Sequence, residues 1–173
     1  MKNNQSCLAL FGTIMLVVCI GYYQLSSGKQ KMDYLQKSGL ATIGRVAIEY
    51  KGLSYSYVVN GVTYKNAQRY SPRGLFNDET YKVIYDPLNP EVSSIDFTSP
   101  VFDTTAYSKI CQQGFQIVGN NSPELIRYTF EYNGDVFTRY QIANASQLDL
   151  SNYFVWVNKG EPHLSYLTNM PCK

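Results

Sequence analysis

The chain has 173 residues, enough for one ordinary domain or two very small ones. Its 15 basic and 13 acidic residues leave the net charge close to zero, and no basic tract or stripe indicates nucleic-acid binding. The composition includes 16 tyrosines but one histidine and one tryptophan. This favours half-buried β-strands and leaves few side chains for catalysis.

The amino-terminal segment is the first predicted element. No charged residue lies between Lys2 and Lys29, and residues 7–21 are almost wholly apolar. With the residues that follow, the apolar stretch approaches the roughly 20 residues that cross a bilayer as a helix. We therefore predict a transmembrane anchor over residues 1–28, followed by a juxtamembrane linker over residues 29–40.

Three fates are open to this segment. It can remain as an uncleaved anchor, or it can be a signal peptide cleaved after the small residues Ser26, Ser27 and Gly28. In the third case it is a lipoprotein signal with lipid attached at Cys19. An uncleaved anchor or an attached lipid makes the lipid bilayer a partner.

Orientation depends on the lysines and the cysteines. Lys29, Lys31 and Lys37 follow the apolar run and by the positive-inside rule favour a cytoplasmic carboxyl side. Cys111 and Cys172, however, bracket the last part of the chain and predict a disulfide, which persists in oxidising compartments. We therefore expect a single-pass protein of the inner membrane with its soluble region in the periplasm or another extracytoplasmic compartment.

Two similar hairpins come next. Residues 57–64 read YVVNGVTY and residues 130–137 read FEYNGDVF, with aromatic residues and Asn-Gly at matching positions. Asn-Gly between alternating apolar residues predicts a type I′ turn, because both turn residues need positive φ. Each hairpin should then carry one aromatic pair across its strands.

The similarity continues beyond the hairpins. Residues 81–95 align with residues 153–167, and residues 42–50 align more vaguely with residues 114–119. Several short strands without a helical period predict an all-β fold: two tandem small β-barrel or rolled-sheet repeats after one N-terminal transmembrane helix. The predicted units are a first β-repeat at 41–100, a linker at 101–113 and a second β-repeat at 114–173.

The first repeat also resembles a known family. Residues 42–97 are similar to a widespread bacterial domain of unknown function found after transmembrane helices, with the pattern Y-x-Y-x-V-x-G-x-x-Y followed by V-x-Y-x-P-x-x-P. Residues 114–170 form a weaker second copy, which keeps Pro162 but lacks the Tyr-Asp-Pro element. The resemblance implies a small, β-rich, membrane-associated fold and no activity.

Candidate chemistry is sparse. Cys111 and His163 are the residues that would make a thiol–imidazole pair, which gives the alternative of an envelope hydrolase that uses Cys111. The single histidine and the dispersed carboxylates do not have metal-ligand spacing. No Gly-rich phosphate-binding loop is present either. We therefore expect neither a metal nor a cofactor, and no enzymatic activity.

The most polar loop of the first repeat is residues 71–79, SPRGLFNDE. If the domain binds a partner, the candidate contact residues are Tyr70, Arg73, Phe76 and Asp78. The function expected from these observations is a non-enzymatic, membrane-anchored binding or scaffolding protein of the bacterial envelope. Neutralising a partner protein, as an immunity protein does, is one such role. A lipoprotein assembly factor lipidated at Cys19 is the other alternative.

Overall fold

The computed structural model describes residues 28–69, 72–112, 115–119, 123–144 and 153–168. The strands in chain order are β1 (Leu40–Glu49), β2 (Gly52–Val59), β3 (Val62–Gln68), β4 (Thr80–Tyr85), β5 (Ser93–Pro100), β6 (Tyr107–Gln112), β7 (Gln116–Ile117), β8 (Glu124–Tyr132), β9 (Asp135–Ala143), β10 (Tyr153–Asn158) and β11 (Ser165–Leu167). A short 3₁₀ turn, η1 (Thr104–Ala106), precedes β6. The prediction of an all-β fold is confirmed.

The prediction of a transmembrane helix is contradicted. Residues 28–38 are helical, but this stretch is far shorter than the roughly 20 residues needed and carries four charged side chains. Among the described residues, no helix is long and apolar enough to cross a membrane. The apolar run that motivated the predicted anchor and the inner-membrane localisation lies in residues 1–27, outside the described residues.

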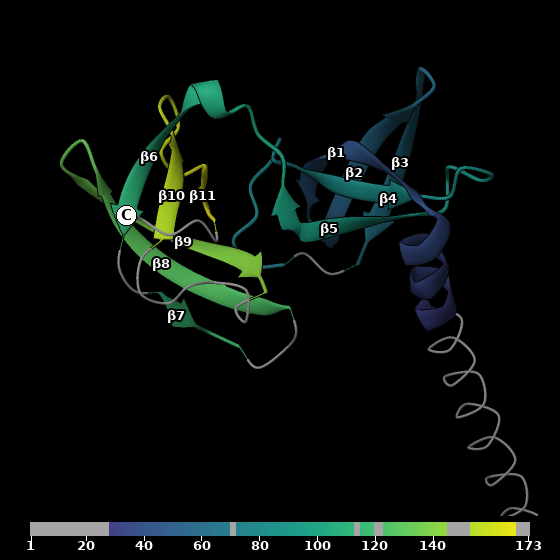
Figure 1. The fold of residues 1–173 in the computed structure, drawn as a ribbon, viewed down its shortest axis with the longest axis horizontal. Coiled ribbons are helices and arrows are strands. Elements are labelled where there is room, and N and C mark those ends of the chain that lie inside the picture. The colour runs from purple at the N-terminus through teal and green to yellow at the C-terminus, as the bar shows by residue number, and fades with distance from the viewer. Residues whose placement is uncertain (1–27, 70–71, 113–114, 120–122, 145–152, 169–173) are drawn as a thin grey trace, which may run out of the picture.

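The first repeat is one open antiparallel sheet with the strand order β3-β2-β1-β4-β5 (Figure 1). Its two ends are not joined by backbone pairing, so the sheet is not a closed barrel. Side chains bridge them instead: the Tyr55 hydroxyl lies 3.1 Å from Ser93 Oγ, and Asn66 Nδ2 donates to that oxygen at 2.6 Å. The Tyr57 hydroxyl donates to the carbonyl of Pro90.

The second repeat has the same strands in two smaller sheets, with the orders β11-β10-β6 and β7-β8-β9. In the first repeat β1 pairs with both β2 and β4. In the second repeat this strand is divided: β6 pairs with β10 as β1 pairs with β4, and β7 pairs with β8 as β1 pairs with β2. β6 therefore lies in the second half of the predicted linker, residues 101–113. Neither of the two sheets is closed.

The predicted turns are confirmed in both repeats. Asn60 and Gly61 have φ of 51° and 80°, and Asn133 and Gly134 have φ of 54° and 87°. Positive φ at both central residues is the type I′ geometry, whose twist matches that of the strands.

The predicted aromatic pairs are also confirmed. Tyr57 faces Tyr64 with ring centroids 5.8 Å apart, and Phe130 faces Phe137 with centroids 5.4 Å apart. Since the pairs occupy the same register in both hairpins, they fix the pairing of β2 with β3 and of β8 with β9.

Each repeat has its own apolar core, and the two cores correspond position by position. The first contains Leu53, Tyr55, Tyr57, Tyr81, Val83 and Ile95, and the second contains Ile126, Tyr128, Phe130, Tyr153, Val155 and Leu167. The duplication seen in the sequence is therefore a duplication of packing as well.

Substitution of the turn glycines tests the turn geometry. Gly61→Val and Gly134→Val should each lower the free energy of unfolding by about 1–2 kcal/mol, because a β-branched residue tolerates positive φ poorly. A Cβ at either position meets nothing within 4 Å, so the cost comes from the backbone conformation and not from a clash. Urea unfolding measures it. Gly119→Val is the control, since Gly119 has open space and no positive φ; equal losses in all three variants would contradict the turn assignment.

Candidate functional site

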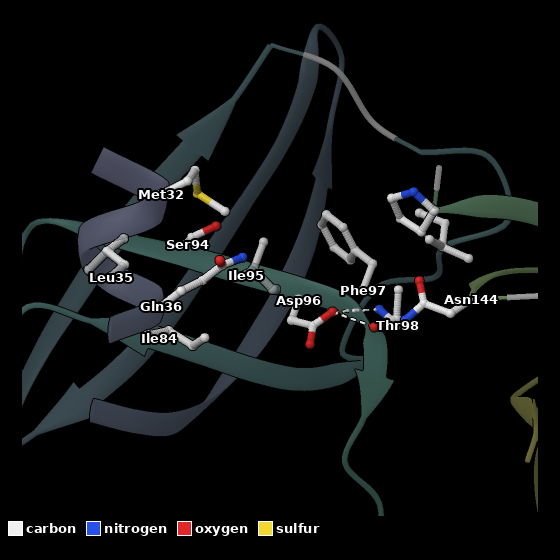
Figure 2. Close-up of a pocket in the computed structure, with 12 residues that line it drawn as sticks. Met32, Leu35, Gln36, Ile84, Ser94, Ile95, Asp96, Phe97, Thr98 and Asn144 are labelled. Carbon is white, nitrogen blue, oxygen red and sulfur yellow. Dashed lines mark hydrogen bonds between the residues drawn. The ribbon is translucent and has the colours of Figure 1, made fainter. Parts of the chain in front are cut away.

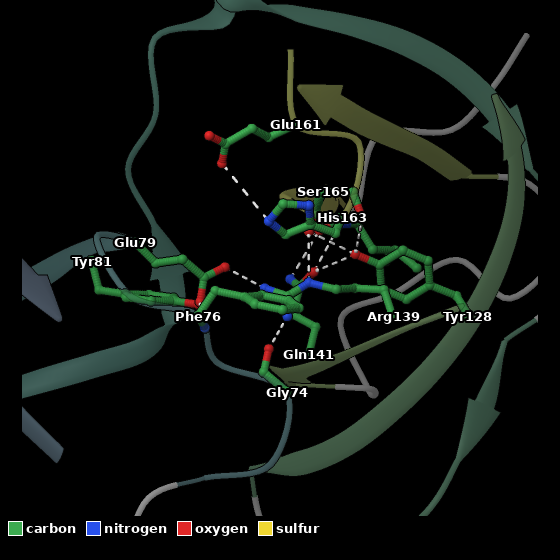
Figure 3. Close-up of polar contacts among 11 residues, drawn as sticks. Gly74, Phe76, Glu79, Tyr81, Tyr128, Arg139, Gln141, Glu161, His163 and Ser165 are labelled. Carbon is green, nitrogen blue, oxygen red and sulfur yellow. Dashed lines mark hydrogen bonds and ion pairs between the residues drawn. The ribbon is translucent and has the colours of Figure 1, made fainter. Parts of the chain in front are cut away.

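A buried ion pair joins the two repeats. Arg139, on β9, extends its guanidinium into the first repeat, where Nη2 donates to Oε1 of Glu79 (Figure 3). The two side chains are 3% and 0% exposed. Removing two charges from water costs several kcal/mol per ion, so such a pair persists only when its remaining hydrogen-bonding groups are also satisfied.

Neighbouring groups satisfy the remaining hydrogen-bonding atoms of the pair. Oε2 of Glu79 accepts hydrogen bonds from the Phe76 backbone N–H at 2.8 Å and from the Tyr81 hydroxyl at 3.2 Å. Arg139 also donates to the carbonyl of Gly74. Its guanidinium lies 4.5 Å from the centre of the Phe76 ring, a cation–π contact. We call Gly74, Phe76, Glu79 and Arg139 the clasp.

Two tyrosines of the cores surround the clasp. Burial, followed by the charge of Glu79, raises the pKa of Tyr81, and burial also raises the pKa of Tyr128. Both hydroxyls thus stay protonated and act as donors: Tyr128 donates to the carbonyl of Ser165 at 2.9 Å.

The clasp has no counterpart within the first repeat. The residue of β3 that corresponds to Arg139 is Asn66, whose amide donates to Ser93 Oγ and to the Glu91 carbonyl at 2.9 Å, both in its own repeat. Arg139 is longer and reaches across to the other repeat. The difference between a short amide and a long guanidinium at one repeat position therefore produces the junction between the repeats.

The loop predicted to bind a partner takes part in this junction. Phe76 lies against Arg139 and, at a centroid distance of 4.9 Å, against His163 of the second repeat. Arg73 is exposed and lies 4.8 Å from the ring centre of Tyr140 on β9.

The other two predicted contact residues do not join this group. Asp78 is exposed and faces Arg45 at 3.6 Å, an ion pair within the first repeat. Tyr70 lies outside the described residues. Glu79 belongs to the predicted loop 71–79 but was not among its candidate contact residues, and Arg139 was not predicted. A Glu directly before an apolar strand and an Arg on an aromatic face were available as signals.

Two cavities lie along the junction on the β5 side. One, of about 410 Å³, is bounded by Met32 and Leu35 of the helix, by β4 and β5, and by Ile142 and Asn144 at the end of β9 (Figure 2). The other, of about 440 Å³, extends from β5 towards Leu167. We call the two together the junction groove.

The two cavities share three polar residues, Asp96, Thr98 and Asn144. Among the described residues, Asp96 is the one charged residue that lines either cavity. Its carboxylate is oriented by the Thr98 backbone N–H at 3.0 Å and by the Ser99 hydroxyl at 2.8 Å. The groove therefore combines apolar walls with one fixed negative charge.

The two candidates for nucleophilic chemistry lie apart from this groove. Cys111, on β6, is disulfide-bonded, and a sulfur in a disulfide carries no thiolate for attack. His163 Nε2 lies 3.8 Å from Glu161, and its ring packs against Phe76. Among the described residues, no three His, Cys, Asp or Glu side chains lie together as potential metal ligands.

Comparison with known proteins adds no relative. No family model matches the chain, and no curated protein or solved structure matches it. The resemblance of residues 42–97 to the bacterial domain of unknown function therefore stays a prediction.

The clasp is testable by unfolding. Arg139→Met leaves the buried Glu79 carboxylate without its cation and should lower the free energy of unfolding by about 3–5 kcal/mol. The double variant Arg139→Met, Glu79→Met removes both charges and should lose less than the two single variants combined. Both are measured by urea denaturation.

The exposed pair Lys65–Glu49, at 3.2 Å, provides the matched control. Lys65→Met should cost less than about 1 kcal/mol, because solvent screens the pair. If Arg139→Met costs no more than Lys65→Met, the clasp does not hold the repeats together.

The pairing of Cys111 stays a prediction. Cys7, Cys19 and Cys172 all lie outside the described residues. A bond to Cys172 would close a loop of about 60 residues, which the chain-entropy model values at roughly 4 kcal/mol. Non-reducing peptide mapping of thiol-blocked protein should recover one peptide pair that contains both Cys111 and Cys172. Recovery of Cys111 with Cys7 or Cys19 instead would contradict this pairing.

Proposed function

We propose that this protein is a non-enzymatic scaffold that binds a partner protein in the junction groove. The observation that carries the proposal is the groove itself: two adjoining cavities, bounded by both repeats, that meet at Asp96, Thr98 and Asn144. Cavities of this size are in the range of specific binding sites, and interfaces between structural units are a common location for them.

The clasp supports this proposal because it fixes the walls of the groove. β5 belongs to the first repeat and β9 to the second, so the shape of the groove depends on how the repeats are joined. A buried ion pair with several satisfied hydrogen bonds holds them in one arrangement before any partner arrives. Preorganisation of this kind lowers the entropic cost of binding.

The lining indicates the chemistry of the bound segment. Met32, Leu35 and Ile84 give one end of the groove an apolar wall, and Asp96 places a carboxylate near its middle. Among the described residues that line the groove there is no Lys, Arg or His. An extended segment with an apolar side chain next to a Lys or Arg fits this arrangement, since its cation would face Asp96.

A scaffold of this kind acts by covering part of the surface of its partner. If the covered surface is the active part of the partner, binding neutralises it, as an immunity protein does. The rival function, hydrolysis by Cys111, requires a free thiolate, and the disulfide removes it. The binding proposal uses no residue of the rival site, so the two are separable by experiment.

Photo-crosslinking from the groove tests the proposal. A photoreactive amino acid at Gln36 and, separately, at Asn144 should capture the same protein, because both residues line the groove. Asp96→Asn should reduce that capture about tenfold or more through loss of a charge-assisted hydrogen bond. Mass spectrometry identifies the captured protein.

The control position is Thr129, an exposed residue on β8 that does not line the groove. Capture of one species from Thr129 as efficiently as from Gln36, or capture unaffected by Asp96→Asn, would show that the groove is not the binding site. Thermal melting of Asp96→Asn confirms that the variant remains folded.

A further inference from the structure

The outer edge of β9 is covered by the first repeat. Gly74 lies so close to β9 that a Cβ in its place would be 2.5 Å from Tyr140 Cβ and 2.6 Å from the Tyr140 carbonyl oxygen. Gly74 has φ of 89°, so it combines a left-handed conformation with a close approach that only glycine permits. A segment of the first repeat thus shields the strand edge of the second.

The edge of β3 is not covered in this way. β3 corresponds to β9 in the repeat and forms the end of its sheet. Because Asn60-Gly61 form a two-residue turn, Val59 and Val62 exchange ladder bonds, and the bonded pairs alternate from there. The backbone groups of Thr63, Lys65 and Ala67 consequently point away from β2.

These outward groups have no partner in the part of the chain that the structure describes. All three residues are exposed. Ala67 stands at the position that corresponds to Tyr140, where the second repeat receives Gly74. The molecule therefore shows one strand edge occupied and the equivalent edge open.

We propose that the open edge of β3 binds an extended, acidic segment of a partner protein by strand addition. In this mode, main-chain hydrogen bonds to Thr63, Lys65 and Ala67 supply affinity, and neighbouring side chains supply specificity. The site is separate from the junction groove, because no residue of β3 lines either of the two cavities.

The charges near β3 select an acidic segment. Lys65 lies on β3, Arg69 directly follows it and Lys51 lies in the turn before β2, and all three are exposed. Lys65 forms an exposed ion pair with Glu49. A carboxylate of the incoming segment can replace Glu49 in this pair, because exposed ion pairs contribute little to stability. Opposite charges directly across two paired strands stabilise the pairing, and like charges oppose it.

A hollow beside β3 offers a place for one side chain of the segment. It has a volume of about 470 Å³ and lies on the outer face of the sheet. Thr63 of β3, Val58 of β2 and Arg45 of β1 contribute to its lining. A side chain of the bound segment that extends past Thr63 would contact apolar groups and the Arg45 guanidinium in this hollow.

A second copy of this chain is a poor occupant. Antiparallel pairing of two β3 strands about Lys65, the central outward-facing residue, would place two lysines directly opposite each other. Lysines on edge strands are a common means of preventing such pairing. The charge pattern thus favours a foreign acidic strand over self-association.

The test uses the full chain and three synthetic nine-residue peptides that alternate valine with one other residue. The first contains glutamate, the second contains lysine, and the third is the glutamate peptide with N-methyl groups at alternate residues. The glutamate peptide should shift the amide NMR signals of Thr63, Lys65 and Ala67 and bind at least about threefold more tightly than the lysine peptide. The N-methylated peptide should not bind, since it cannot complete the main-chain ladder.

Charge reversal completes the design. Lys65→Glu should reverse the order of the two affinities, so that the lysine peptide binds more tightly than the glutamate peptide. Thr138→Glu, at the corresponding position of β9, is the matched control and should leave both affinities unchanged. Amide spectra of both variants report whether each is folded.

The outcomes that overturn the inference are distinct. Equal binding of the N-methylated peptide, or shifts confined to the junction groove, would exclude strand addition at β3. A dimer seen by sedimentation without peptide, and lost in a Thr63→Pro variant, would assign the edge to self-association. Loss of crosslinking at Gln36 and Asn144 bears on the groove alone and leaves the β3 result unaffected.

Discussion

The arrangement of the two repeats depends on one buried ion pair. Arg139 and Glu79 are 60 residues apart in the sequence, and both are almost fully removed from solvent. Neither charge is tolerable there alone, because an unpaired buried charge costs several kcal/mol. Each charge therefore needs the other, and the Phe76 N–H and the Tyr81 hydroxyl bond the Glu79 carboxylate as well. These contacts fix the orientation of the two repeats relative to each other and so shape the junction groove.

Duplication followed by divergence explains why the pair lies at this place. Both repeats keep the Asn-Gly turn, the aromatic pair and a tyrosine that hydrogen-bonds to a serine of the last strand, Tyr55 with Ser93 and Tyr128 with Ser165. They differ at the junction, where Arg139 of the second repeat stands at the position of Asn66 in the first. They also differ in their first strand, because the strand that corresponds to β1 is divided into β6 and β7 in the second repeat.

This divergence also makes the two sides of the molecule unequal. The second repeat receives a loop of the first on its strand edge, whereas no described loop covers the edge of β3, which meets Glu91 and Ser93 through the Asn66 side chain. A unit whose repeats were identical in their contacts would either cover both edges or propagate by adding further copies. The asymmetry instead leaves one groove beside β5 and one strand edge on β3, two distinct surfaces, as the proposed scaffold requires.

The sequence by itself determined the local features of this fold. Type I′ turns need positive φ at two consecutive residues, so Asn-Gly specified them directly, and strand alternation then specified which tyrosines face the core. Tertiary structure alone decided the partner of Arg139, the division of the first strand and the use of Phe76 inside the junction. These depend on contacts between residues far apart in the chain, and no local period or turn signal encodes which distant carboxylate a buried guanidinium will meet.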